Sequence, residues 1–335
     1  MHRKINIVIW TIALVLAILL GVIFLFSDQV KLYEKTFHYF DTDITVRIYE
    51  RDQEKVTYAW EKIESIYQDY DHLSDPHKSY DEMVNIHTIR YNKEETEVLT
   101  LDERLYQMLE YANEWQEKSN GVLQINQGAL IDGWESYLEL GESIPSEAKI
   151  NAWNEADQSV LVLQENNQMK NNHPMLDLGK IPLGFANDEV ASYLKEENIT
   201  QFLIQEGGNA NAGLSYKQKP YKVALEILNE NDVATIVFIQ NKSIVTEVSD
   251  LNRYEYDGKT YHLLIDPETS YPASKIEKVT VIANDSKTAY TVSHILYLMD
   301  SKEGKEWLEN LSDIEALWQD LDGFRITTTG FSQYE

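Results

Sequence analysis

The chain has 335 residues, and its 29 basic and 56 acidic side chains give a formal net charge of −27. This charge argues against binding to the phosphates of nucleic acid and against lying flat on anionic lipid. The sequence contains no cysteine, which excludes disulfides, thiolate catalysis and cysteine-based zinc or iron–sulfur sites.

The N-terminal segment 5–26 is apolar apart from Asn6 and Thr11. About 22 residues at ~1.5 Å rise each give a helix of roughly 33 Å, enough to cross a bilayer core. Basic residues precede the segment, so we predict residues 1–4 in the cytoplasm, a single-pass anchor in the cell membrane, and an extracytoplasmic remainder. A cleaved signal peptide is the alternative, although no Ala-x-Ala-like site follows Phe26. Residues 27–35 are predicted to be a tether.

Elements of both kinds are predicted in the first half of the remaining chain. Apolar alternation predicts a strand over Thr36–Tyr49. Apolar residues at helical spacing predict helices over Val56–Tyr70 and Asp102–Ser119. The polar stretch 71–97 is predicted to be irregular, and Gly141–Pro145 breaks the segment after the second helix.

The second half is predicted to be richer in strands. Helices are predicted over Phe185–Glu197 and from a cap at Asp285 or Ser286 to Met299. The predicted strands are Val160–Leu163, Gln201–Gln205, Val223–Leu228, Val233–Gln240, Ser243–Val248, Val279–Ala283, Ile314–Trp318 and Phe324–Thr328. Because strands and helices do not alternate strictly, we expect an α+β fold with a mixed sheet and helix core.

Two short motifs contain residues suited to a ligand site. Gly207-Gly208-Asn209 follows a predicted strand, where glycines let backbone N–H groups approach phosphate oxygens. His262 and Asp266 lie in the segment HLLIDPETSYP, residues 262–272, and can place an imidazole and a carboxylate at the mouth of a sheet. Taken singly, each motif is more often only a turn or a strand histidine.

The order of several segments is more specific than any one of them. The segments are GVLQI (121–125), MLDLGKIPLGFAND (175–188), Gly207-Gly208-Asn209, HLLIDPETSYP (262–272) and TAYTVSH (288–294). This order resembles that of the FAD:protein FMN transferases, the ApbE-type enzymes, over residues 36–331. The resemblance implies an ApbE-like, T-fold-like core with a flavin cleft between two lobes.

The resemblance also implies a reaction and a set of site residues. Such enzymes bind FAD, a Thr or Ser hydroxyl of an exported flavoprotein attacks its pyrophosphate, FMN stays on the acceptor, and AMP leaves. Mg²⁺ neutralises the developing phosphate charge. The implied catalytic residues are His262 and Asp266. The implied flavin contacts are Phe40, Val122, Leu123, Gln124, Asp177, Leu183, Gly207, Gly208 and Asn209.

The sequence departs from the family pattern at the Mg²⁺ site. The resemblance implies a backbone carbonyl ligand at the position of Lys180, an aspartate where this chain has Tyr290 and a threonine where it has His294, and Leu183 replaces the signature lysine. Mg²⁺ prefers oxygen ligands in octahedral array, which a phenol protonated at neutral pH and an imidazole supply poorly. An alternative that would preserve phosphate binding is that the Lys180 side chain partly replaces Mg²⁺ as the positive charge that binds the phosphate.

Two functions therefore stay open at the level of sequence. One is Mg²⁺-dependent FMN transfer to an extracytoplasmic flavoprotein. The other, favoured by the substituted ligand positions, is a catalytically inactive pseudoenzyme that binds flavin or a partner protein. A purely structural domain with an empty cleft is a weaker third alternative.

Overall fold

The computed structural model of the chain describes residues 10, 14–16, 29–92, 97–225, 235–249, 253–321 and 323–335. The predicted membrane anchor, 5–26, lies almost wholly outside these residues. Among the described residues, no helix combines the length and the apolar character needed to cross a membrane.

One antiparallel sheet of eight strands organises the fold, in the order β1-β2-β6-β7-β10-β15-β16-β17. Its strands are β1 (Lys31–Tyr39), β2 (Thr42–Glu50), β6 (Phe202–Glu206), β7 (Asn209–Ala212), β10 (Lys242–Val248), β15 (Lys278–Ala283), β16 (Glu315–Gln319) and β17 (Arg325–Thr327). The sheet joins segments far apart in sequence, since β2 pairs with β6 from Ile44↔Glu206 to Ile48↔Phe202.

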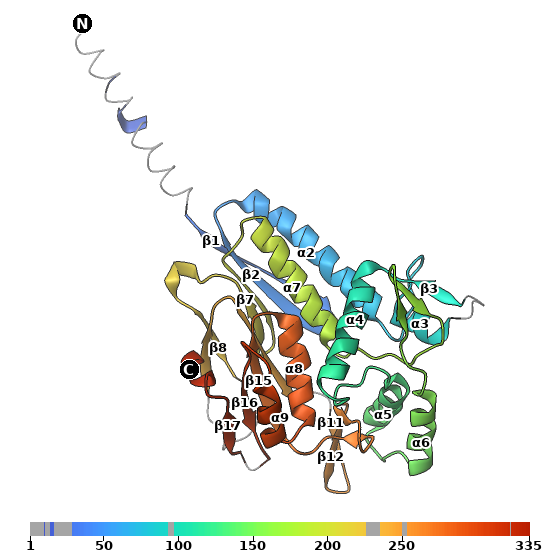
Figure 1. Cartoon of the computed structure of the whole chain (residues 1–335). Helices are drawn as coiled ribbons and strands as arrows, with labels where there is room; N and C mark the ends of the chain where they lie inside the picture. The colour runs from blue at the N-terminus through green and yellow to red at the C-terminus, as the bar shows by residue number, and fades with distance from the viewer. Residues whose placement is uncertain are drawn as a thin grey trace, which may run out of the picture.

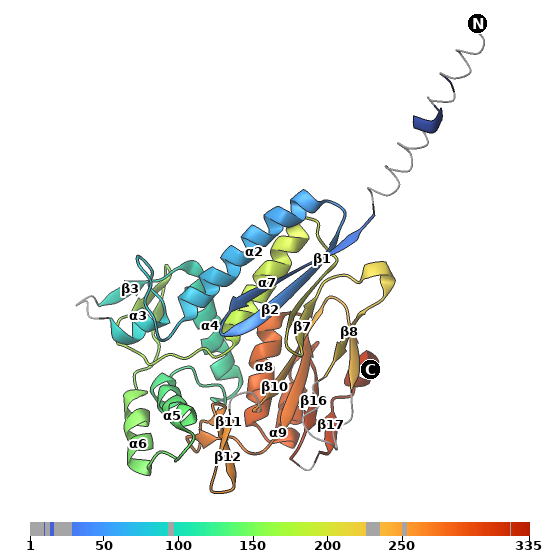
Figure 2. The same cartoon turned by 180° about the vertical axis from the view of Figure 1, so that it is seen from behind.

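Helices cover one face of this sheet, as Figures 1 and 2 show from opposite sides. The helices are α2 (Gln53–Ser74), α4 (Glu103–Lys118), α7 (Ile181–Glu196), α8 (Ser286–Leu298) and α9 (Ser301–Leu308). Their apolar sides and the facing strand residues form the main core, which includes Ile63, Leu183, Val190 and Ile295. The hydrophobic effect thus fixes α7 and α8 against the sheet and against each other.

A second core cluster lies on other residues of the same strands. It includes Ala210, Ile244 and Leu317, together with Val223 of β8 (Tyr221–Ala224) and Val237 of β9 (Ile236–Ile239). A 3₁₀ turn, η2 (Phe331–Tyr334), adds the fully buried Phe331 to this cluster. A further 3₁₀ turn, η1, covers Tyr216–Gln218.

Helices α5 (Gly128–Leu140) and α6 (Glu147–Ala156) lie beside the hairpin β11–β12 at one end of the molecule (Figure 1). A separate cluster of buried residues connects these elements, and it includes Trp134 of α5 and Tyr254 and Tyr261 of the hairpin. The strands of this end are β11 (Arg253–Tyr256), β12 (Lys259–His262), β13 (Ile265–Asp266) and β14 (Tyr271–Pro272). The small elements α3 (Ile86–Tyr91), β3 (Val98–Thr100), β4 (Leu163–Gln164) and β5 (Gln168–Lys170) complete the neighbouring region.

The structure corrects the predicted start of the domain. Residues 31–35, predicted as tether, form the first half of β1, and Thr36–Tyr49 is a hairpin rather than one strand. The turn lies at Phe40 and Asp41, both with positive φ. Asp41 is a residue type that favours turns, and the backbone N–H of Phe40 donates to Asp71 Oδ1 at 2.7 Å.

Several helix boundaries also differ from prediction. Helix α7 begins at Ile181 instead of Phe185, because Pro182 is well suited to the first helical turn. Helices α3, α5 and α6 were not predicted. Two glycines in α5 hid its pattern: a Cβ on Gly128 would lie 2.3 Å from Arg90 Nη2, and one on Gly133 would lie 2.4 Å from the Trp153 ring. Of the predicted strand Val160–Leu163, only Leu163 is in a strand.

Substitution of Gly184 by alanine tests the close packing of α7 against α8. A Cβ on Gly184 would lie 2.6 Å from the Cα of Lys287. Gly→Ala in a helix normally stabilises by about 0.5–1 kcal/mol, but here overpacking should reverse the sign. We expect Gly184→Ala to lower the free energy of unfolding in urea by about 1–3 kcal/mol.

Gly304→Ala in α9 is the matched control. There the Cβ would meet the movable Cδ2 of Leu296 at 3.0 Å, so the loss should be smaller. A Gly184→Ala protein as stable as the wild type would contradict backbone contact between the two helices.

Candidate functional site

The turn between β6 and β7 is open to a ligand. Its two residues are Gly207 and Gly208, and Glu206 faces Asn209 across the hairpin. Gly207 has φ +53°, a conformation that favours glycine. A Cβ added at either glycine would meet no heavy atom within 4 Å. The turn backbone is therefore accessible at this point of the sheet.

Directly behind this turn, Glu206 is a buried carboxylate whose relative exposure is only 8%. Its Oε2 accepts a hydrogen bond from the Tyr290 hydroxyl at 2.5 Å and another from Asn209 Nδ2 at 3.1 Å. Burial, and next the charge of Glu206, raise the pKa of Tyr290, so its phenol stays protonated and donates. Asn209 is itself fixed, because its Oδ1 accepts from the backbone N–H of Thr246 at 2.8 Å.

Glu247 of β10 is a second buried carboxylate nearby. The Nδ1 atom of His294 lies 3.8 Å from its Oε2. Burial acts to raise the pKa of Glu247, but the contact with His294 and the charge of Lys180 outweigh burial and hold the pKa below its ordinary value. The charge of Glu247 is therefore compensated from two sides.

Lys180 is the cap residue of α7 and is exposed as a residue. Desolvation acts to lower the pKa of its ammonium, but attraction to Glu247 and Glu206 outweighs this and raises it. No described residue lies within ion-pair distance of this ammonium. We call Lys180, Glu206, Asn209, Glu247, Tyr290 and His294 the carboxylate cluster.

The carboxylate cluster does not suit Mg²⁺. The space lined by Glu206, Asn209, Ser286 and Tyr290 has no room for a water molecule. Mg²⁺ needs near-octahedral oxygen ligands and usually keeps several waters. Here the donors of Tyr290 and Asn209 already fill Glu206 Oε2, and the Lys180 side chain adds a positive charge near Glu206 and Glu247. The residues present therefore do not fit the ion.

His262 of β12 is buried, and both of its ring nitrogens bond to the backbone. Its Nε2 donates to the carbonyl of Ala273 at 2.9 Å, and its Nδ1 accepts the N–H of Leu264 at 3.2 Å. This pattern assigns the neutral tautomer protonated at Nε2. Burial lowers the pKa of His262. The predicted catalytic imidazole thus holds the chain between β12 and β14.

Asp266 makes a comparable local contact. Its Oδ1 accepts from the N–H of Glu268 at 2.9 Å, an Asx turn, and its Oδ2 lies 3.7 Å from Lys275 Nζ. The Asp266 carboxylate keeps free acceptor capacity, although only part of its side chain reaches solvent.

Asp177 is tied to a buried arginine that the sequence analysis did not single out. The Arg90 side chain is 0% exposed and donates from Nε to the carbonyl of Leu176 at 2.6 Å. Its Nη1 lies 3.1 Å from both carboxylate oxygens of Asp132, and its Nη2 lies 3.5 Å from Asp177 Oδ2. Asp177 Oδ1 also accepts the N–H of Gly179 at 2.8 Å. Asp177 therefore fixes the backbone of the segment that leads into α7.

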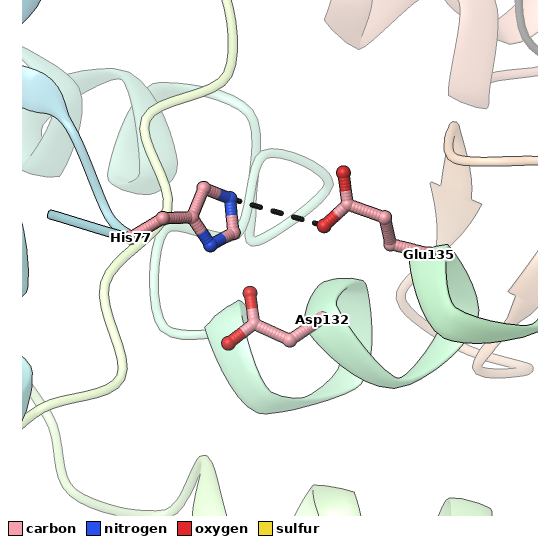
Figure 3. A group of neighbouring side chains, drawn as sticks. All are labelled: His77, Asp132 and Glu135. Carbon is pink, nitrogen blue, oxygen red and sulfur yellow. Dashed lines mark ion pairs between the residues drawn. The ribbon is translucent and has the colours of Figure 1, made fainter. Parts of the chain in front are cut away.

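Asp132 belongs to another group with metal-ligand character, shown in Figure 3. Asp132 and Glu135 project from α5 toward His77, and one ligand atom from each lies within 4.8 Å of the others. His77 Nε2 is 3.8 Å from Glu135 Oε2. Because Arg90 already engages both oxygens of Asp132, we assign no metal to this group.

The remaining predicted flavin contacts divide between core and loop. Leu123 and Leu183 are buried in the main core, and their predicted contacts with a flavin stay predictions. Gln124 Nε2 donates to the Gly121 carbonyl at 2.8 Å, and Val122 packs partly against the core. Phe40 lies in the β1–β2 turn. These residues do not join the carboxylate cluster.

Asp188, the last residue of the 175–188 motif, was missed as a structural residue. Its two oxygens accept the N–H groups of Ser286 at 2.7 Å and Lys287 at 3.0 Å. A carboxylate at a helix N-terminus satisfies unpaired donors and the helix dipole. Asp188 on α7 thus caps α8. Its position at the end of the motif was the available signal.

Comparisons with known proteins agree on one family. A model described as the ApbE family matches residues 40–318. The FAD:protein FMN transferase of Escherichia coli K12 is 30% identical over 200 residues, 56% of this chain and 57% of that protein. The FAD:protein FMN transferase of Klebsiella pneumoniae is 26% identical over 238 residues, which cover 66% of this chain and 70% of that protein. The chain thus matches little more than half of the Escherichia coli relative.

Solved structures show the same fold. The flavin transferase ApbE from Vibrio cholerae superposes with a TM-score of 0.76 at 18% identity, covering 91% of this chain and 100% of that one. The ApbE protein from Thermotoga maritima gives a TM-score of 0.77 at 21% identity, covering 91% and 99%. The predicted ApbE-like arrangement of sheet and helices is therefore confirmed.

Tyr290→Phe tests the hydroxyl that satisfies Glu206. Removing one donor from a buried carboxylate should lower the free energy of unfolding by about 1–3 kcal/mol at pH 7. In a double-mutant cycle of denaturant unfolding, Glu206→Gln should reduce the cost of Tyr290→Phe. Additive effects of the two substitutions would mean that the contact contributes nothing.

The lowered pKa of His262 predicts a pH dependence of stability. Its contribution is complete above the ordinary pKa of 6.5 and is lost as the pH falls through the lower folded value, because the unfolded chain binds the proton first. We expect the melting temperature of the wild type to fall more between pH 7 and 5 than that of His262→Gln. His38→Gln, at a side chain 71% exposed, is the control. Equal slopes for wild type and His262→Gln would contradict the assignment.

Proposed function

The chain belongs to the ApbE family, and on this premise we propose that it binds FAD and transfers FMN from it to a flavoprotein. The supporting observation is the open turn at Gly207-Gly208, which directly follows Glu206, one of the two carboxylates that raise the pKa of Lys180. Accessible backbone N–H groups and a nearby cation are the partners that a pyrophosphate requires.

In the proposed reaction, the hydroxyl oxygen of a Thr or Ser on the acceptor attacks the phosphorus on the FMN side of the pyrophosphate. The P–O bond to the other phosphate breaks, AMP leaves, and the hydroxyl proton passes to solvent. FMN stays on the acceptor as a phosphoester. The chain's own contribution is to bind and orient the pyrophosphate and to offset its charge, which is the main demand of such a transfer.

We further propose that this takes place outside the cytoplasm, on an exported flavoprotein, with the chain held in the membrane by residues 5–26. The apolar run and the basic residues before it support this topology. The formal net charge of −27 suits a domain that stays in solution away from anionic lipid.

A second candidate function is flavin binding without transfer. Both nitrogens of His262 are committed to the backbone, and Tyr290 closes Glu206 to a metal ion. A protein of this kind would hold flavin or dock a partner while leaving the pyrophosphate intact.

The two candidates differ in one product. The full chain in detergent is incubated with FAD and a Thr-containing acceptor peptide, with and without MgCl₂, and assayed by mass spectrometry. Transfer predicts the mass of an FMN phosphoester on the peptide and one AMP for each FMN. FAD binding, seen by flavin fluorescence, without AMP would support the second candidate. Failure to bind FAD would reject both flavin-dependent functions and leave partner docking or a structural role.

A further inference from the structure

We propose that Lys180 replaces the divalent cation of this site, so that the chain binds the pyrophosphate of a flavin dinucleotide without a metal ion. This inference rests on the proposed FAD binding but concerns a different property, the source of the positive charge. It names Lys180 as the residue that distinguishes FAD from a flavin without phosphates.

The first step is that the carboxylates here are not available to a metal. Glu206 Oε2 accepts from both Tyr290 and Asn209, and Glu247 lies beside His294. The side chains that bind Glu206 are themselves buried. The adjoining space does not admit a water molecule, so a hydrated Mg²⁺ would have to displace Tyr290. Displacement would leave a buried phenol and a buried amide without partners, which is costly.

The second step is that positive charge is nevertheless supplied here by the chain. The Lys180 ammonium interacts with the charges of both Glu206 and Glu247. The negative charges of these two carboxylates stabilise the protonated form of Lys180, as carboxylate ligands stabilise a bound metal cation. The ammonium remains without a hydrogen bond or close ion pair to the part of the chain that the structure describes. Its positive charge is therefore not neutralised by a direct contact within the described residues.

The third step concerns access. Lys180 is exposed, and the residue before it, Gly179, has φ +50° with no heavy atom within 4 Å of an added Cβ. Gly207 and Gly208, which directly follow Glu206, are equally unobstructed. The proposal therefore places the pyrophosphate at this turn, next to Glu206, one of the two carboxylates whose charge acts on the Lys180 ammonium. Lys binds phosphate as a compact point charge, which suits this role.

Binding of FAD to the full chain in detergent tests the inference, with flavin fluorescence as the measurement. The wild type should bind FAD with the same Kd in EDTA and in excess MgCl₂. Lys180→Gln should weaken FAD binding about tenfold or more, as expected for loss of a charge-assisted contact. Its affinity for riboflavin, which lacks phosphates, should stay within about twofold of wild type. Lys180→Arg should restore most of the FAD affinity.

Lys302→Gln, at a side chain 85% exposed on α9, is the matched control and should bind FAD like the wild type. Circular dichroism shows whether each variant is folded, and the comparison with riboflavin separates lost phosphate binding from a damaged flavin site. If EDTA abolishes FAD binding, or Lys180→Gln binds FAD as the wild type does, the inference is overturned while the proposed function stands. A wild type that binds no FAD under either condition overturns both.

Discussion

The structure at this site depends on the compensation of two buried carboxylates, Glu206 and Glu247. A carboxylate removed from water is stable only where donors and positive charge replace its hydration. Tyr290 and Asn209 provide the donors for Glu206, and a side-chain contact with His294 and the charge of Lys180 stabilise the ionised form of Glu247. These contacts connect β6, β7, β10, α7 and α8. These residues therefore stabilise the junction between the sheet and the two helices.

Arg90 satisfies a comparable requirement in the segment just before α7. Its buried guanidinium connects Asp132 on α5 with Asp177 before α7 and with the Leu176 carbonyl. Removing one partner of such an arrangement leaves an uncompensated charge, which usually destabilises more than the pair stabilises. Asp188 then fixes α8 to α7 through backbone N–H groups. Polar contacts thus set the orientation of helices whose packing energy comes from apolar burial.

These contacts change the meaning of the substitutions at the metal positions. Tyr290 and His294 are four residues apart on α8, yet they engage different carboxylates on different strands. Their side chains occupy the space and the acceptor atoms that a metal ion would need. Lys180 contributes charge from a third element. Under the proposal that Lys180 replaces the ion, the three altered residues would each supply one property of the ion: its volume, its ligand contacts or its charge.

The sequence by itself determined the family, the α+β class and the positions of α2, α4, α7, α8 and most sheet strands. Those features rest on motif order and on local apolar periodicity, which are properties of neighbouring residues. Only the tertiary structure decided that Leu123 and Leu183 face the core, that His262 bonds to the backbone, and that Arg90 and Asp188 are structural residues. It also revealed α5, whose glycines at 128 and 133 weaken the helical pattern but admit Arg90 and Trp153. The reason is physical: each of these contacts joins segments 11 to 98 residues apart, and a local pattern contains no information about which distant group will satisfy a buried charge or fill a gap.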